Sequence, residues 1–161
     1  MGLFSFIKNA GAKVFGIGKT TEEEALEVAE KAAEIAREKA SKLTNAVETL
    51  GFEVIDLNIE VSGDSATIWG QADSQATKEK VILVVGNTEG IATVDDRMTV
   101  EVPEPEAQFH TVVKGDYLSK IAKKYYGDAM KYPIIFEANK PMLSDPDKIY
   151  PGQVLRIPAL D

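Results

Sequence analysis

The chain has 161 residues, enough for one large domain or for two small domains with modest cores. It has no cysteine and a single histidine, His110, which excludes disulfides, thiolate metal sites and zinc sites built on paired histidines. The formal net charge is −8, and only six of the 26 acidic residues follow residue 108, so the acidic first part argues against a nucleic-acid partner.

Residues 1–19 are apolar at the start and rich in glycine afterwards. Leu3, Phe4 and Ile7 are spaced for one side of a short helix, which we expect to dock on the rest of the chain. A membrane-surface anchor is the alternative use of the same residues. The start lacks the basic leader and long apolar core of a secretion signal, and no apolar run could span a membrane, so we expect a cytoplasmic protein.

A long helix is predicted next, because Thr21 and Glu24 have capping-box spacing. Apolar residues three and four apart then continue from Leu26 to Leu50, before Gly51. Such a stripe suits either a coiled-coil seam or close packing within the chain. Its many alanines favour packing within the chain, so we expect a monomer.

The spacing of apolar residues then changes to two, which predicts strands. Strands at 54–61 and 66–69 flank the turn 62–65, whose glycine and aspartate tolerate positive φ. A second helix, capped by Asp73 or Ser74, follows, and 91–102 is predicted as a further strand.

The stretch from Val81 to Ile91 joins that helix to that strand. Its five consecutive aliphatic residues predict a helix covered on more than one side. We expect Gly86 to supply a left-handed helix end and Gly90 a second bend. Helix ends leave carbonyl groups without intrahelical partners, and these oxygens need water, amides or a cation. A capped helix followed by a tight turn explains the same pattern without a ligand.

This part of the chain resembles the BON domain from about Glu23 to Val102, and we place the domain at residues 20–102. The resemblance is carried by Ile68-Trp69-Gly70 and by the turn Gly90-Ile91-Ala92-Thr93-Val94-Asp95-Asp96 into the last strand.

A stiff, proline-containing linker is predicted at 103–108. Residues 109–158 then resemble a LysM domain with a βααβ order. The matching motifs are Val112-x-x-Gly115-Asp116-x-Leu118, Asn139, and the closing Pro151-Gly152-Gln153-Val154-Leu155-Arg156-Ile157-Pro158. The chain is therefore expected to have an α+β fold of two small domains preceded by a short helix.

LysM domains bind N-acetylglucosamine polymers, so this resemblance implies peptidoglycan fragments as a ligand class. The groove would lie between two loops, and its candidate residues are Gly115, Asp116, Tyr117, Leu118, Ile149, Tyr150 and Pro151. Tyr117 departs from the family's usual threonine. Turn and core geometry require several of these residues whether or not sugar binds. A cytoplasmic protein would also be separated from peptidoglycan by a membrane.

Taken together, the start of the chain, the loop 85–91 and the segment 135–143 resemble the bacterial cytoplasmic potassium-binding proteins built of a BON domain followed by a LysM domain. That resemblance implies selective, reversible K⁺ binding that alters the relation of the two domains, with no reaction catalysed. Backbone carbonyls can replace the water shell of K⁺ without diagnostic side chains. Guided by the family, the expected ligands are the backbone oxygens of Ile7, Ala10, Gly86, Thr88 and Ile91.

Overall fold

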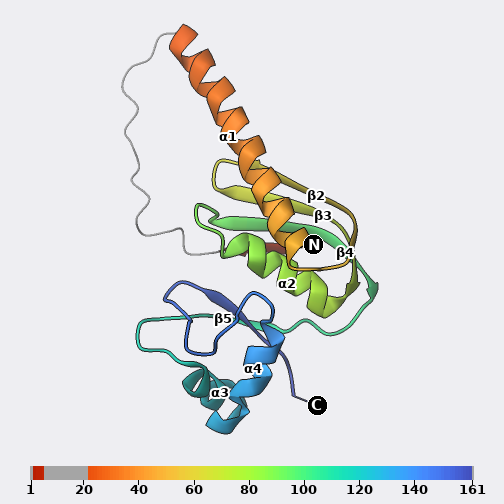
Figure 1. Cartoon of the computed structure of the whole chain (residues 1–161), viewed down its shortest axis with the longest axis vertical. Coiled ribbons are helices and arrows are strands. Elements are labelled where there is room, and N and C mark those ends of the chain that lie inside the picture. The colour runs from red at the N-terminus through yellow and green to blue at the C-terminus, as the bar shows by residue number, and fades with distance from the viewer. Residues whose placement is uncertain (1, 6–21, 161) are drawn as a thin grey trace.

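The computed structural model describes residues 2–5 and 22–160, and for residues 2, 5 and 22–26 it describes only the backbone. These residues form an α+β fold, as predicted, with two bodies that lie along the long axis of the molecule (Figure 1). No helix among the described residues combines the length and the apolar character needed to cross a membrane.

The first body is a four-stranded sheet covered on one face by two helices (Figure 1). The strand order is β1-β4-β3-β2, with β3 and β4 parallel and the other neighbours antiparallel. Its elements are β1 (Gly2–Ser5), α1 (Glu22–Thr49), β2 (Val54–Ser62), β3 (Ser65–Ser74), α2 (Gln75–Gly86) and β4 (Thr93–Val102).

The expected N-terminal helix is wrong for Gly2–Ser5, which form the edge strand β1 against β4. A short isolated helix is marginal in water, whereas the free edge of β4 offers a row of backbone partners. The Phe4 ring also meets the Phe109 ring of the second body edge to face, with 5.5 Å between centroids. The rest of the expected helix, including Ile7 and Ala10, lies outside the described residues.

Helix α2 lies between the sheet and the second body. Ser74 caps its start by accepting a hydrogen bond from the Thr77 amide at 3.2 Å, in agreement with the prediction. Val81, Ile82 and Leu83 are all buried, although they point in different directions around the helix. The expectation that this aliphatic run is covered on more than one side is therefore confirmed.

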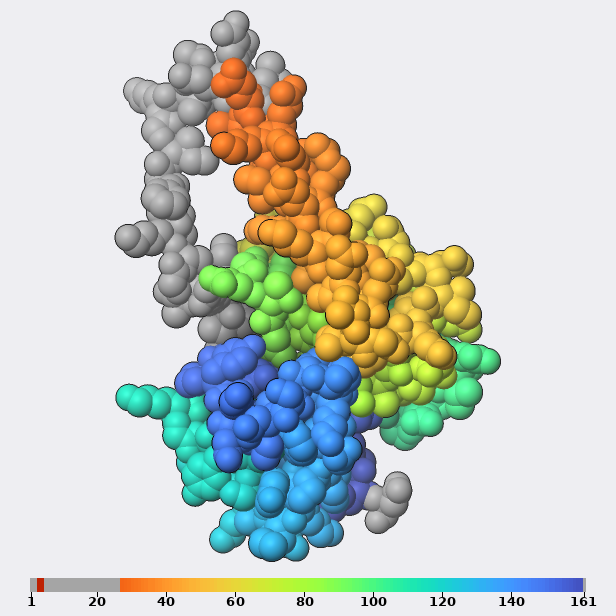
Figure 2. Space-filling model, in the orientation of Figure 1, coloured from red at the N-terminus to blue at the C-terminus, as the bar shows by residue number. Residues whose placement is uncertain are grey.

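Helix α1 packs on the sheet only through its C-terminal half. Leu43 and Val47 are buried in the core of the first body, whereas Ala29 and Ala33 of the same stripe are exposed. The helix extends well beyond the sheet (Figures 1 and 2). Packing along the whole apolar stripe is thus a prediction that fails for the described residues of its first half.

The second body has its own core around two antiparallel strands and two helices. Its elements are β5 (Gln108–Thr111), α3 (Leu118–Tyr126), a 3₁₀ turn η1 (Ala129–Lys131), α4 (Tyr132–Ala138) and β6 (Val154–Ile157). Tyr117 is the N-cap of α3 and makes no side-chain capping bond. The hydroxyl that a threonine would bring to this position is therefore replaced by an exposed aromatic ring.

Candidate functional site at the end of α2

The end of α2 turns sharply into the loop that precedes β4. Gly86 is the last helical residue, but it does not adopt the left-handed conformation expected from sequence. Asn87 closes the helix in right-handed geometry, with φ −80° and its amide bonded to the Leu83 oxygen at 2.9 Å. The positive φ of this loop falls at Gly90, at 91°, where the chain reverses toward β4.

Hydrogen bonds hold the loop in one shape. The Thr88 amide donates to the Val85 oxygen at 3.2 Å, and the Thr88 hydroxyl donates to the Val84 oxygen at 2.7 Å. The Ile91 amide donates to the Thr88 oxygen at 3.2 Å. These bonds do not use the oxygens of Gly86 or Ile91, and a carbonyl that accepts one bond, such as that of Thr88, keeps a second lone pair.

Three of the five predicted ligand residues therefore share one loop. Gly86 and Ile91 are buried, and Thr88 is exposed. The other two, Ile7 and Ala10, lie outside the described residues. A positively charged side chain lies close to the loop. Lys39 Nζ of α1 would be 3.6 Å from a Cβ atom placed on Gly90. Among the described residues, no group of three or more carboxylate or imidazole side chains is arranged to hold a metal ion.

A buried carboxylate joins the middle of α2 to the second body. Glu79 is 2% exposed, and its Oε1 atom accepts a hydrogen bond from Arg156 Nε of β6 at 2.7 Å. Its Oε2 atom accepts from the Ala107 amide at 2.9 Å and from Gln75 Nε2 at 3.3 Å. Burial, and then the positive charge of Arg156, lower the pKa of neighbouring Lys80 below 10.5.

The end of α2 is joined to the same strand. Asn87 Nδ2 donates to the Val154 oxygen at 2.8 Å, and the Val154 amide donates to Asn87 Oδ1 at 2.8 Å. Between the two bodies lies a pocket of about 310 Å³, lined on one side by Leu83 and Thr88 and on the other by Lys148 and Tyr150. The loop that carries three predicted potassium ligands thus faces one of the two predicted glycan loops.

The predicted glycan residues divide into buried and exposed sets. Leu118 is buried and Ile149 packs on the same core, so both have structural roles. Tyr117 is 58% exposed and Tyr150 is 47% exposed. Burial raises the pKa of Tyr150 above 10.0. Gly115 has a φ of +90° and open space where a Cβ atom would stand, and Pro151 is exposed.

Asp116 holds the turn before α3 from inside. Its Oδ2 atom lies 2.9 Å from His110 Nε2 and accepts the Val113 amide at 3.0 Å. The other ring nitrogen of His110 lies 3.0 Å from the Tyr125 hydroxyl. Burial alone would raise the pKa of Asp116, but the His110 and Val113 hydrogen bonds, with the charges of His110 and Lys120, hold that pKa below 3.8. Asp116 is therefore placed to fix the turn.

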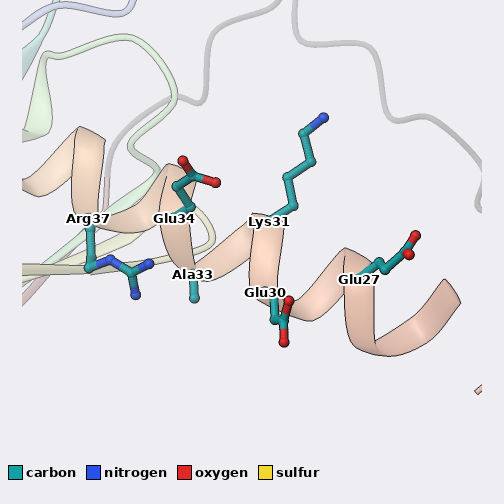
Figure 3. Close-up of a pocket in the computed structure, with 6 residues that line it drawn as sticks. All are labelled: Glu27, Glu30, Lys31, Ala33, Glu34 and Arg37. Atoms are coloured by element: carbon teal, nitrogen blue, oxygen red, sulfur yellow. The ribbon is translucent and has the colours of Figure 1, made fainter. Parts of the chain in front are cut away.

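A separate hollow runs beside the exposed half of α1, and the described residues that line it all belong to that helix. Figure 3 shows that Lys31 and Glu34 point to one side of the helix, whereas Glu30 and Arg37 point to the other. The six described side chains diverge and do not converge on a common point.

Sequence reasoning missed the residues that join the two bodies. Glu79 and Arg156 are 77 positions apart, and Asn87 and Val154 are 67 apart. The one local signal for Glu79 was a carboxylate two positions before the aliphatic run that begins at Val81. No local signal pointed to Val154, because its contribution comes from the backbone.

Comparison with known proteins matches both bodies to families. Residues 38–102 match the BON domain, and residues 110–158 match the LysM domain. The fold and the domain order therefore define a protein in which a BON domain is followed by a LysM domain.

The relatives narrow this class. The chain is 44% identical over 159 residues to the potassium binding protein Kbp of Escherichia coli, covering 98% of this chain and 99% of that protein. It therefore belongs to the Kbp family. An uncharacterized protein of Deinococcus radiodurans is 32% identical over 144 residues, covering 80% of this chain and 56% of that protein. An esterase of Mycobacterium tuberculosis is 47% identical over 53 residues, covering 33% of this chain but 11% of the esterase.

Proposed function

We propose that this chain is a cytoplasmic, monomeric protein that binds K⁺ selectively and reversibly, without catalysing a reaction. The observation that carries the proposal is its 44% identity, over nearly the whole of both chains, to a protein named for potassium binding. The proposed ligands are the backbone oxygens of Gly86, Thr88 and Ile91, together with those of Ile7 and Ala10. We also propose four segments for the chain. They are an N-terminal segment at 1–19, the BON-like domain at 20–102, the linker at 103–108 and the LysM domain at 109–158.

The loop supports this proposal through its chemistry. K⁺ is a large monovalent ion that several carbonyl dipoles can hold in place of water. The last turn of α2 contributes the negative end of a helix dipole, which favours a cation. The hydrogen bonds of Thr88 and Ile91 fix the loop without using the oxygens of Gly86 and Ile91.

Calorimetric titration of the full chain with KCl, and with NaCl at equal ionic strength, tests the proposal. We expect saturable binding of K⁺ and much weaker binding of Na⁺. Gly90→Ala strains a φ of +91° in the loop and should lower the K⁺ affinity at least about ten-fold. Gly127→Ala is the matched control, because Gly127 has a φ of +75° and open surroundings at the end of α3, in the LysM domain. Equal heats for the two salts would overturn the proposal.

A second candidate function is binding of N-acetylglucosamine polymers by the LysM domain. The observation in its favour is that Tyr117 and Tyr150, on the two predicted glycan loops, both expose their rings. Chitooligosaccharide added to the labelled full chain should shift the amide signals of these loops in an NMR spectrum. Unchanged spectra at millimolar sugar would remove this candidate.

A further inference from the structure

The outer edge of β6 is closed by two asparagine side chains instead of a strand. The described sheet of the LysM domain has only β5 and β6, so one edge of β6 faces away from β5. Val154 and Arg156 are two apart, and their backbone groups therefore point to the same edge. Asn139 of the LysM domain pairs with both groups of Arg156, at 2.9 and 2.8 Å. Asn87 of the BON domain pairs with both groups of Val154, at 2.8 Å each.

We propose that Asn87 is the positioning residue that couples LysM docking to cation binding. This inference rests on the proposed potassium function. Asn87 lies between Gly86 and Thr88, whose oxygens are two of the proposed ligands. Its backbone amide closes the last turn of α2 on Leu83, while its side chain closes the edge of β6. The same residue therefore shapes the loop and holds the second domain.

The carboxamide suits this task because it has both a donor and an acceptor. Its NH₂ group meets the Val154 oxygen, and its oxygen meets the Val154 amide. Aspartate would keep the second bond but place a carboxylate oxygen against the Val154 carbonyl. Alanine would leave both backbone groups of Val154 without this partner, at a part-buried position where a lost partner is costly.

Coupling through one residue works in both directions. A cation that orders the carbonyls around Asn87 favours the side-chain geometry that receives β6, and a docked β6 favours the loop that binds the cation. Glu79 and Arg156 also hold the domains together, but Glu79 lies about two turns earlier in α2, outside the loop. Asn87, in contrast, contacts the second domain by its side chain from within the loop.

The first experiment needs no variant. Hydrogen exchange of the full chain, followed by NMR with and without K⁺ at constant ionic strength, compares the amides of Val154 and Arg156. We expect K⁺ to slow exchange at Val154 several-fold and to leave Arg156 nearly unchanged, because Arg156 is held by Asn139 inside the LysM domain. Equal changes at both amides, or none at Val154, would overturn the inference.

The second experiment measures K⁺ affinity and interdomain distance in the same variants. Asn87→Ala should weaken K⁺ binding about five-fold or more and lengthen the distance between spin labels on the two domains at a given K⁺ concentration. Asn45→Ala, on the exposed face of α1, is the control and should behave as the unchanged chain does. Asn87→Ala with unchanged K⁺ affinity would refute the coupling role while leaving the potassium function intact. Absence of K⁺ binding by the unchanged chain would refute both.

Discussion

At the scale of single residues, a positive charge from another element lies beside the proposed cation loop. Lys39 reaches from α1 toward Gly90, and its side chain is only partly exposed. An ammonium at this place opposes a second cation in the loop, because like charges repel more strongly where water is partly excluded. We therefore expect Lys39 to lower the K⁺ affinity of the proposed loop site.

We predict that Lys39→Gln raises K⁺ affinity about two- to five-fold, the range expected for a part-exposed charge interaction. The gain should shrink at high ionic strength, because salt screens the removed charge. Lys31→Gln, two turns earlier on the exposed part of α1, is the control and should leave the affinity unchanged. Titration calorimetry of the three chains checks this. A lower affinity in Lys39→Gln would show that Lys39 supports the loop rather than opposing the ion.

At the scale of elements, β2 and β3 meet across a bulge. The register shifts between Ile55 and Asn58, Asp56 has a φ of 56°, and Gly70 faces this point from β3. A Cβ atom on Gly70 would lie 2.7 Å from Val54 Cγ1 and 3.2 Å from the Ile55 oxygen. The close approach of two backbones therefore requires glycine here.

Gly70→Ala should lower the free energy of unfolding by more than about 2 kcal/mol, because it adds a clash with backbone to a strained φ of +142°. Gly63→Ala is the matched comparison: its φ is +61°, but no atom lies within 4 Å, so only the conformational cost of about 1 kcal/mol applies. Urea unfolding followed by circular dichroism measures both. Equal losses of unfolding free energy in Gly70→Ala and Gly63→Ala would mean that the bulge relaxes around the added methyl group.

The turn before α3 gives a pH dependence with a defined sign. Asp116 has a pKa below its ordinary 3.8 in the folded state, so the folded state favours the charged carboxylate. This contribution to stability is present above pH 3.8 and is lost as the pH falls through the lowered pKa. We predict that Asp116→Asn reduces the loss of thermal stability of the LysM domain between about pH 5 and pH 2. Asp147→Asn, on an exposed turn, should lose as much thermal stability over this pH range as the unchanged chain does. Identical pH profiles of thermal stability for both variants would contradict the role assigned to Asp116.

At the scale of the whole molecule, a buried ion pair joins the two domains. Replacing Glu79 by Gln leaves Arg156 without its anion at a site where both side chains are nearly inaccessible, and such a loss typically costs about 3–5 kcal/mol. We predict a marked fall in the unfolding midpoint and a looser arrangement of the domains. Glu137→Gln removes an exposed pair with Lys140 and should cost less than about 1 kcal/mol. Similar midpoints for the two variants would show that the interface does not depend on Glu79.

The sequence predicted the α+β fold because its signals are local. Period-two spacing marked β2, β3 and β4, Ser74 marked the start of α2, and the closing Pro-Gly-Gln motif marked the LysM domain. Two predictions failed for non-local reasons. Gly2–Ser5 become a strand because the edge of β4 is free, and the first half of α1 extends past the sheet because the sheet ends.

The candidate site was accessible from sequence only in part. Gly86, Thr88 and Ile91 stand close together along the chain, so their loop could be recognised from its glycines and the helix end. Asn87 was in the same loop, but its partner is the backbone of Val154, 67 positions away. The residues near Val154 show no pattern that predicts an open strand edge. Which side chain closes that edge is decided by tertiary packing.

The proposed function requires that main-chain oxygens of the Gly86 loop hold K⁺. Thallium(I) resembles K⁺ in size and charge and scatters X-rays anomalously, so a crystal of the full chain grown with thallium(I) salt locates the ion directly. We predict an anomalous peak within coordination distance of the oxygens of Gly86, Thr88 and Ile91, which excess K⁺ removes and Na⁺ leaves in place. A crystal with no anomalous peak at this loop, or with a K⁺-competed peak elsewhere, would contradict this placement of the ion.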